Sequence, residues 1–235
     1  MPEAPLSEAE LQALCRFDTP TICNALELVA PQRRALGFTT ETLICPFPEL
    51  PPMVGYARTA LIRSALPPGL SAAEQRQTRL EYYRYVASGG GPKIVVIQDV
   101  DSRVGFGCFW GEVQTAIHKA LGCKGLVTDG GVRDLDAVAP EFQVLCGKVT
   151  PSHAWVHAIA FGGTVDVFGM VVRSDDLIHA DRHGAVVIPH EIAREVPKAA
   201  ELCARREEPI LKVARSPDFS LEALERAMAE AAEIH

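Results

Sequence analysis

The sequence lacks an excess of positive charge and has no long apolar run. Its 235 residues carry a formal net charge of -7, with a pI near 5.5, so it offers no broad positive field to nucleic acid or to an anionic membrane. No apolar stretch approaches the roughly 20 residues of a membrane-spanning helix, and Met1–Phe17 does not resemble a signal peptide. We therefore predict a cytoplasmic protein that binds neither nucleic acid nor membrane.

Paired cysteines are also missing. The seven cysteines include no C-x-x-C pair and their number is odd, so we interpret them as buried thiols in a reducing cytoplasm. The hydrophobic share of 48% is enough to build a full core. Because no linker-like segment divides the chain, we predict a single domain over residues 1–235.

What the sequence does contain is a succession of helical and strand patterns, which indicates an α/β fold with helices at both ends. Two helices are predicted within Ser7–Val29, separated at Asp18-Thr19-Pro20 by an N-cap that is followed by a first-turn proline. A strand is predicted over Val54–Arg63 and a helical excursion over Ser71–Ala87. A strand-helix-strand unit follows at Lys93–Val100, 111–121 and Leu126–Thr128. Further strands are predicted at Phe142–Leu145, Val165–Val172, Leu177–Ala180 and Ala185–Ile188, and two final helices at His190–Arg206 and Leu221–Ile234. The helix at 111–121 is expected to bury the face that carries Val113, Ala116, Ile117, Ala120 and Leu121.

Two short motifs carry the chemistry. The first N–H groups of a helix have no partner inside it, so the helix start at Gly111–Gln114 can receive a carboxylate. Gly130–Gly131 is expected to form a tight turn after a strand, which would place Arg133 and Asp134 where α/β sheets bind ligands. Arg133 offers a planar fork for a carboxylate and a carbonyl oxygen, and Asp134 offers a hard oxygen ligand for a cation. Alternatively, both residues merely cap a short helix at Arg133–Val138 and pair with neighbours.

These motifs resemble the family that contains the regulator of ribonuclease activity A (RraA) and the class II 4-hydroxy-4-methyl-2-oxoglutarate aldolases. The shared pattern covers about residues 50–215 and consists of Gly111-Glu112, D-G-x-x-R-D at Asp129–Asp134, and similar segments at Val54–Thr59, Val149–Pro151 and Asp176–Pro189. The sequence departs from the family at Asp175, where glycine is usual, and at Asn24, where aspartate is usual. The excursion over Leu66–Pro92 is longer than in compact members, which leaves the identity of the substrate open.

The resemblance implies a fold and a site. The fold would be a β/β/α sandwich similar to the phosphohistidine swivelling domain, assembled as a homotrimer or hexamer. A small 2-oxo acid would bind to Arg133 and to the backbone amides of Gly111, Glu112, Val113 and Gln114. Asp134 would bind Mg²⁺, Mn²⁺ or another divalent cation, Glu112 would orient a water, and Glu207 or Glu208 would come from a neighbouring subunit.

The implied activity is that of a metal-dependent C–C lyase. It would cleave 2-oxo acids like 4-hydroxy-4-methyl-2-oxoglutarate to pyruvate, through an enolate stabilised by the metal and Arg133. Decarboxylation of oxaloacetate produces the same enolate, so this side activity is also expected. The alternative within the family is a non-catalytic protein that binds and inhibits ribonuclease E through its surface. The acidic residues that accompany Arg133 favour the enzyme.

The histidines at metal-like spacing are interpreted as structural. His153 and His157 lie four residues apart, but no third ligand stands at a fixed offset from them. His179 is expected to alternate with Asp181 along a strand, with His183 in the turn that follows. None of these histidines is therefore predicted to hold a metal.

Overall fold

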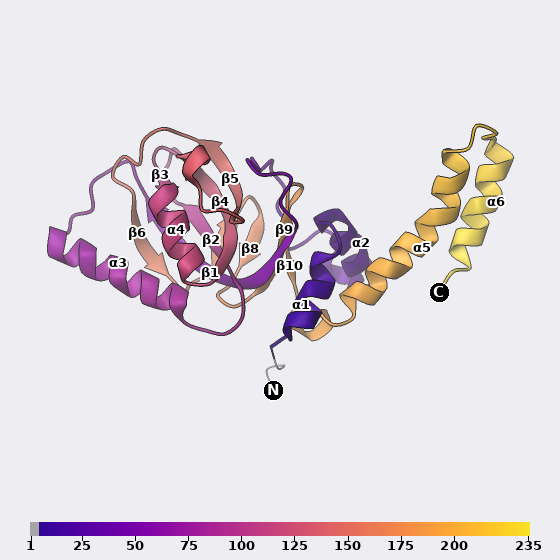
Figure 1. Cartoon of the computed structure of the whole chain (residues 1–235), viewed down its shortest axis with the longest axis horizontal. Coiled ribbons are helices and arrows are strands. Elements are labelled where there is room, and N and C mark those ends of the chain that lie inside the picture. The colour runs from indigo at the N-terminus through magenta and orange to yellow at the C-terminus, as the bar shows by residue number, and fades with distance from the viewer. Residues whose placement is uncertain (1–4) are drawn as a thin grey trace.

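A mixed β-sheet forms the centre of the molecule. The computed structural model describes residues 5–235. The first four residues of Met1–Phe17, the segment that does not resemble a signal peptide, lie outside the described residues. Three parallel strands form the middle of the sheet: β1 (Met53–Arg63), β2 (Lys93–Asp99) and β4 (Cys123–Val132). The sheet order is β10-β9-β1-β2-β4-β3, with β5 also paired to β4 and β6 to β1 (Figure 1). The predicted α/β fold class is confirmed.

The remaining strands flank these three or form a separate hairpin. The flanking strands are β3 (Cys108–Trp110), β5 (Gln143–Val149), β6 (His157–Phe161), β9 (Leu177–Asp181) and β10 (Gly184–Ile188), of which β9 lies between β1 and β10. The hairpin consists of β7 (Val165–Val167) and β8 (Met170–Val172). The helices are α1 (Glu8–Cys15), α2 (Thr19–Val29), α3 (Ala72–Ala87), α4 (Glu112–Ala120), α5 (Val196–Ala214) and α6 (Leu221–Ala232), with 3-10 turns η1 (Pro31–Arg33), η2 (Leu135–Ala137) and η3 (His190–Ile192).

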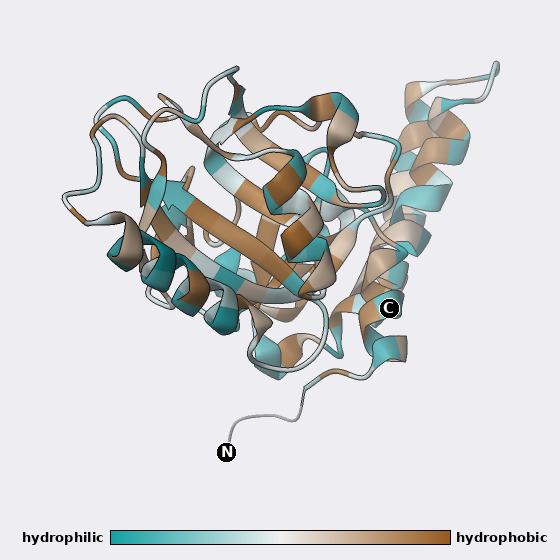
Figure 2. Cartoon of the chain, turned by 60° about the vertical axis from the view of Figure 1, so that its left-hand side comes forward, coloured by the Kyte–Doolittle hydropathy of each residue, from teal (hydrophilic) through white to brown (hydrophobic). Residues whose placement is uncertain are grey.

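Side chains that alternate along the strands build two different cores, one on each face of the sheet. Val95 and Ile97 of β2 pack with Tyr82 of α3 on the helical face. Ile94 and Val96 pack instead with the β7–β8 hairpin on the opposite face. The layers are therefore hairpin, sheet and helix, and Figure 2 shows apolar residues concentrated along the central strands.

The first three helices begin where the sequence predicts. Ser7 and Glu10 form a capping box before α1, and Ser71 and Glu74 form another before α3. Asp18 caps α2, and its side chain accepts a hydrogen bond from the Thr21 amide. These caps are local side-chain contacts, so the sequence is enough to locate them.

Several predicted boundaries are wrong. α5 continues through Pro209 to Ala214 instead of ending near Arg206, and the strands β3 and β6 were not predicted. The single strand predicted over Val165–Val172 is a hairpin, because Phe168 and Gly169 both adopt positive φ angles and reverse the chain.

The C-terminal helices α5 and α6 form an arm that extends away from the sheet (Figure 1). α5 packs first against α2 and then against α6, and the Arg206 side chain donates a hydrogen bond to the Ile234 carbonyl across the arm. Among residues 5–235, no helix combines the length and apolar character needed to cross a membrane.

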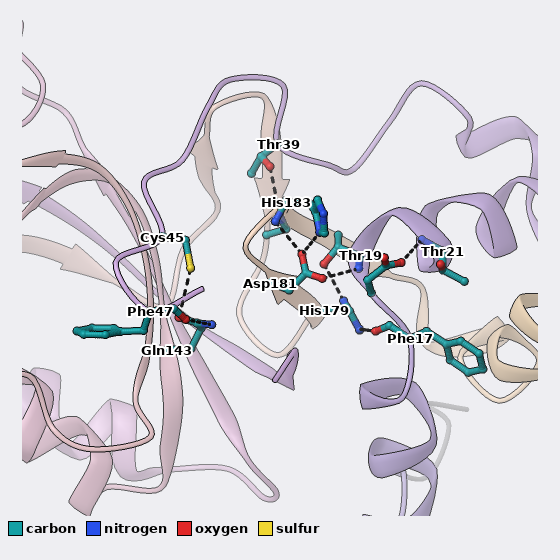
Figure 3. Close-up of polar contacts among 12 residues, drawn as sticks. Phe17, Thr19, Thr21, Thr39, Cys45, Phe47, Gln143, His179, Asp181 and His183 are labelled. Atoms are coloured by element: carbon teal, nitrogen blue, oxygen red, sulfur yellow. Dashed lines mark hydrogen bonds and ion pairs between the residues drawn. The ribbon is translucent and has the colours of Figure 1, made fainter. Parts of the chain in front are cut away.

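A closed polar network ties α2 to β9 (Figure 3). Asp181 accepts hydrogen bonds from the Thr19 amide at 2.9 Å and from the His183 amide at 2.8 Å. The His179 ring contacts the Thr19 hydroxyl and the Phe17 carbonyl, each at 3.0 Å, and burial lowers the pKa of His179 to about 4. His179 and Asp181 lie on one strand and His183 in the turn, as predicted.

Candidate active site

The start of α4 faces the end of β4. Gly111 is the N-cap of α4 and has no side chain with which to cap it. A Cβ atom on Gly111 would lie 2.6 Å from Asp134 Oδ2 and 3.2 Å from Arg133 Cγ. A larger residue at 111 would therefore displace the Asp134 carboxylate from the helix start.

Asp134 is directed to this helix start and does not cap its own turn. It has a left-handed backbone conformation, with φ 53° and ψ 42°, and its side chain makes no capping hydrogen bond to η2. Its Oδ2 accepts instead from the Glu112 amide at a long 3.4 Å. Asp134 therefore does not cap its own turn, although it does pair with the neighbouring Arg133, and its carboxylate stays 37% exposed.

Arg133 and Asp134 open into a cavity of about 370 Å³. The Arg133 Nε lies 3.6 Å from Asp134 Oδ2, and the Arg133 side chain is 38% exposed. Gly111, Val113 and Gln114 line the same cavity, whereas Glu112 does not. The structure thus brings together the two motifs identified in the sequence, with an opening through which a small anion can enter.

The predicted tight turn at Gly130–Gly131 is wrong. Both glycines lie within β4, where Gly131 pairs with Cys108 of β3 and with Lys148 of β5. A Cβ atom on Gly131 would lie 2.7 Å from Thr150 Cγ2, so glycine here allows the strands to approach closely. Strand β4 therefore carries the chain directly to Arg133 without a turn.

Comparison with known proteins identifies the family of this chain. A family model described as RraA-like, Aldolase/RraA, matches residues 19–187. The chain belongs to this family. The resemblance identified from the sequence is thereby confirmed.

Relatives of this RraA-like chain include a protein from Halalkalibacterium halodurans that is provisionally named a 4-hydroxy-4-methyl-2-oxoglutarate aldolase. It is 28% identical over 231 residues, which cover 96% of this chain and 92% of the relative. A solved structure of a protein from Pseudomonas syringae pv. tomato has a TM-score of 0.72 at 22% identity, covering 97% of this chain and 96% of that one. Streptomyces coelicolor RraAS2, described as an unusual member of the RNase ES inhibitor RraA protein family, has a TM-score of 0.67 at 23% identity, with 88% and 98% covered. These two structures show the shared fold.

The buried face of α4 in this RraA-like chain differs from the prediction. Val113, Ala116 and Ala120 are exposed, whereas Thr115 and His118 are completely buried. The spacing of apolar residues did not predict the buried face of α4, because His118 is polar and is buried with its hydrogen bonds satisfied inside the core. Its Nδ1 donates to the Gln114 carbonyl at 2.7 Å, so its Nε2 accepts from the Tyr82 hydroxyl at 2.9 Å. Burial lowers the pKa of His118 to about 4 and keeps the ring neutral.

Helix α3 braces the site, a role that the sequence did not indicate. The Tyr83 hydroxyl donates to Gln114 Oε1 at 3.0 Å, and Tyr82 packs edge-on against Phe109. Arg58 holds the other end of α3, through bonds to the Ser88 carbonyl and to Asp175. The excursion that contains α3 therefore forms one wall of the site.

A buried carboxylate pair lies behind the site, where β2 and β4 run side by side. Asp129, the first residue of the D-G-x-x-R-D motif, accepts a hydrogen bond from the Asp99 amide at 2.7 Å. Asp99 in turn accepts from the Gly105 amide at 2.8 Å. Burial raises the pKa of Asp99, and it raises that of Asp129 to about 7.

Glu207 and Glu208 are not brought to the cavity of their own subunit. Both are exposed in α5, within the arm that extends from the sheet (Figure 1). The isolated chain thus leaves open the prediction that one of them serves a neighbouring subunit. His153 and His157 line the cavity, but residues 5–235 contain no group of three or more His, Cys, Asp or Glu side chains that could hold a metal ion together.

Proposed function

We propose that this chain is a divalent-metal-dependent aldolase that cleaves a 4-hydroxy-2-oxo acid, such as 4-hydroxy-4-methyl-2-oxoglutarate, to pyruvate. Decarboxylation of oxaloacetate is proposed as its second reaction. The observation that carries this proposal is the approach of Asp134 to the start of α4, beside Arg133 and at an open cavity. The name of the Halalkalibacterium halodurans relative supports the same reaction.

The proposed chemistry follows from the charges of the site. The amides at Gly111–Gln114, of which that of Glu112 already makes the long contact to Asp134, would hold the substrate carboxylate. Breaking the C3–C4 bond moves an electron pair toward the 2-oxo oxygen, and the guanidinium of Arg133 would stabilise this negative charge. The proton of the C4 hydroxyl would pass to a water that Glu112 orients, and C3 of the enolate then takes up a proton to give pyruvate.

The residues present suit a magnesium or manganese ion. Magnesium usually keeps several waters and takes only one or two protein carboxylates, and Asp134 offers a half-exposed carboxylate whose one contact to an amide is long. When bound, the ion would supply positive charge for the developing oxyanion. We propose that a neighbouring copy of the chain in a trimer or hexamer contributes Glu207 or Glu208, which are exposed on the arm.

Pyruvate release provides the test. Oxaloacetate and 4-hydroxy-4-methyl-2-oxoglutarate would each be incubated with the protein and Mg²⁺, and again with excess chelator. Because Mg²⁺ itself promotes decarboxylation of oxaloacetate, a reaction with Mg²⁺ but no protein is the control. Release that requires both protein and metal supports the lyase. A protein that releases no pyruvate from either substrate contradicts the proposal and favours the non-catalytic regulator.

A further inference from the structure

We infer that the part of the candidate cavity lined by Leu70, Phe109, Val113 and Trp155 binds a large apolar, preferably aromatic, group of the substrate. This inference rests on the proposed function and concerns the part of the substrate beyond C4. The carbonyl product released with pyruvate would then be a bulky apolar aldehyde or ketone. The cavity volume of about 370 Å³ lies in the range of sites for drug-sized ligands, whereas pyruvate has only six non-hydrogen atoms.

Apolar side chains line the cavity together with the Arg-Asp pair. Leu70, Val113 and Trp155 are 44%, 66% and 58% exposed, and all three line the cavity together with Phe109. These side chains come from four separate segments, namely the excursion before α3, β3, α4 and the loop before β6. Exposed apolar side chains from separate segments that meet at one cavity are typical of a site for an apolar ligand.

Trp155 is the most informative of these residues. Its backbone is fixed on both sides, since its amide donates to the Ser64 carbonyl at 3.0 Å and its carbonyl contacts His157 Nδ1 at 2.7 Å. Within residues 5–235 its ring has no aromatic or cationic partner, whereas Trp110 is buried among Phe109, His118 and Phe142. A half-exposed indole on a fixed backbone at a cavity can stack on an aromatic ligand, because tryptophan has only two side-chain torsions to order.

The competing possibility is a second carboxylate on the substrate. Arg79 lines the same cavity, and the described part of the chain provides it with no ion-pair partner. Arg79 is nevertheless an exposed residue, so water already solvates its charge. The exposed apolar area therefore favours the aromatic group, and the carboxylate is the alternative outcome of the test.

Three non-cleavable probes distinguish these groups. 2-Oxo-4-phenylbutanoate, 2-oxoglutarate and 2-oxopentanoate differ only in the phenyl, carboxylate or methyl group on C4, and none has the C4 hydroxyl needed for cleavage. Titration calorimetry with the full chain and Mg²⁺ should show the phenyl compound binding at least about tenfold tighter than the other two. Its binding should also change the fluorescence of Trp155, one of only two tryptophans.

Variants assign the effect to the cavity. Trp155→Ala should remove most of the phenyl preference, by about tenfold, and leave the affinity for 2-oxopentanoate unchanged. Trp155→Phe should retain most of the preference. Phe219→Ala is the matched control, because Phe219 is 48% exposed but lies between α5 and α6, outside the cavity.

The outcomes separate this inference from the proposed function. Any of four results would overturn the inference. These are tighter binding of 2-oxoglutarate, equal affinities for the three probes, no binding of the phenyl compound, or a Trp155→Ala variant that changes only the oligomeric state. If pyruvate release fails but the phenyl preference and its loss in Trp155→Ala are observed, the proposed reaction is wrong while the aromatic site stands. If 4-hydroxy-4-methyl-2-oxoglutarate is cleaved but the phenyl preference is missing, the aromatic site is wrong while the proposed reaction stands.

Discussion

Two aspartates face two helix starts in this protein, and their surroundings are opposite. Asp181 faces α2, is 6% exposed, and accepts hydrogen bonds from the amides of Thr19 and His183 (Figure 3). Asp134 faces α4, is 37% exposed, and makes one long contact to the Glu112 amide. Both helix starts present free N–H groups to a carboxylate. Only the α2 start has its donors satisfied by the protein itself.

The difference indicates which of the two sites is structural. A saturated, buried carboxylate stabilises the junction between α2 and β9 and has no capacity left for a ligand. An exposed carboxylate beside unsatisfied amides, held by a left-handed backbone, is typical of a site that a ligand completes. Mutations should therefore affect stability at Asp181 and activity at Asp134.

The largest effect is expected from Asp134→Asn. Asparagine tolerates the left-handed conformation, so the fold should persist while the cation ligand is lost. The metal-dependent rate of pyruvate release should fall by about 10³-fold, and Arg133→Ala should cause a comparable loss by removing the counter-charge. Steady-state kinetics on oxaloacetate, with the melting temperature as control, would check both. Near-normal turnover in either variant would refute the role assigned to that residue.

Asp181→Asn should produce the opposite phenotype. An asparagine amide would place a donor against an amide donor of Thr19 or His183, which should lower the free energy of unfolding by about 2 kcal/mol. For a chain of this size, that corresponds to a melting temperature about 4–8 °C lower. The rate per folded molecule should stay unchanged. If Asp181→Asn instead reduced kcat without lowering the melting temperature, the distinction between the two sites would not hold.

Asp129 adds a third case to the comparison of Asp181 with Asp134, because Asp129 is buried but its anionic form is not stabilised. The pKa of Asp129 is about 7 in the folded protein, well above the usual value. Between about pH 4 and pH 7, the folded protein therefore keeps a proton on Asp129, whereas the unfolded chain has lost it. Stability should therefore decrease as the pH rises through that window. Asp129→Asn can still accept from the Asp99 amide, and it should raise the free energy of unfolding by about 2 kcal/mol at pH 8.

Denaturant unfolding of both proteins at pH 4.5 and pH 8 would measure this effect. The gain in Asp129→Asn should be small at the lower pH and largest at the higher pH. His118 and His179, whose pKa values are lowered to about 4, act in the opposite direction and make both proteins less stable as the pH falls below about 6.5. An equal difference between the two proteins at both pH values would contradict the pKa assigned to Asp129.

The smallest effect is expected from Tyr83→Phe. This substitution removes only the hydrogen bond to Gln114 Oε1, a contribution of about 1 kcal/mol. Because Gln114 lines the cavity at the α4 start, we expect KM for oxaloacetate to rise about fivefold with kcat almost unchanged. The exposed Arg76→Gln variant on the same helix is the control. A fall in kcat at constant KM would show that α3 does more than position the binding residue.

Local chemistry explains which parts of the structure could be predicted. Capping residues such as Ser71 and Asp18 interact within a few residues, so the helix starts were found. Strand β3 has only three residues and is defined by its pairing with β4, so its own sequence gives little signal. The buried face of α4 was missed for a related reason, since the bond from Tyr82 that satisfies His118 comes from a distant helix.

The sequence by itself determined the chemical groups of the site: a helix start without a capping side chain at Gly111, and a guanidinium next to a carboxylate at Arg133 and Asp134. It also determined the α/β class and the family pattern. Only the tertiary structure decided which carboxylate remains open. Saturation depends on the donors that packing brings within about 3 Å. Packing supplies them to Asp181 but leaves Asp134 with two long contacts at the cavity, to the Glu112 amide and to Arg133.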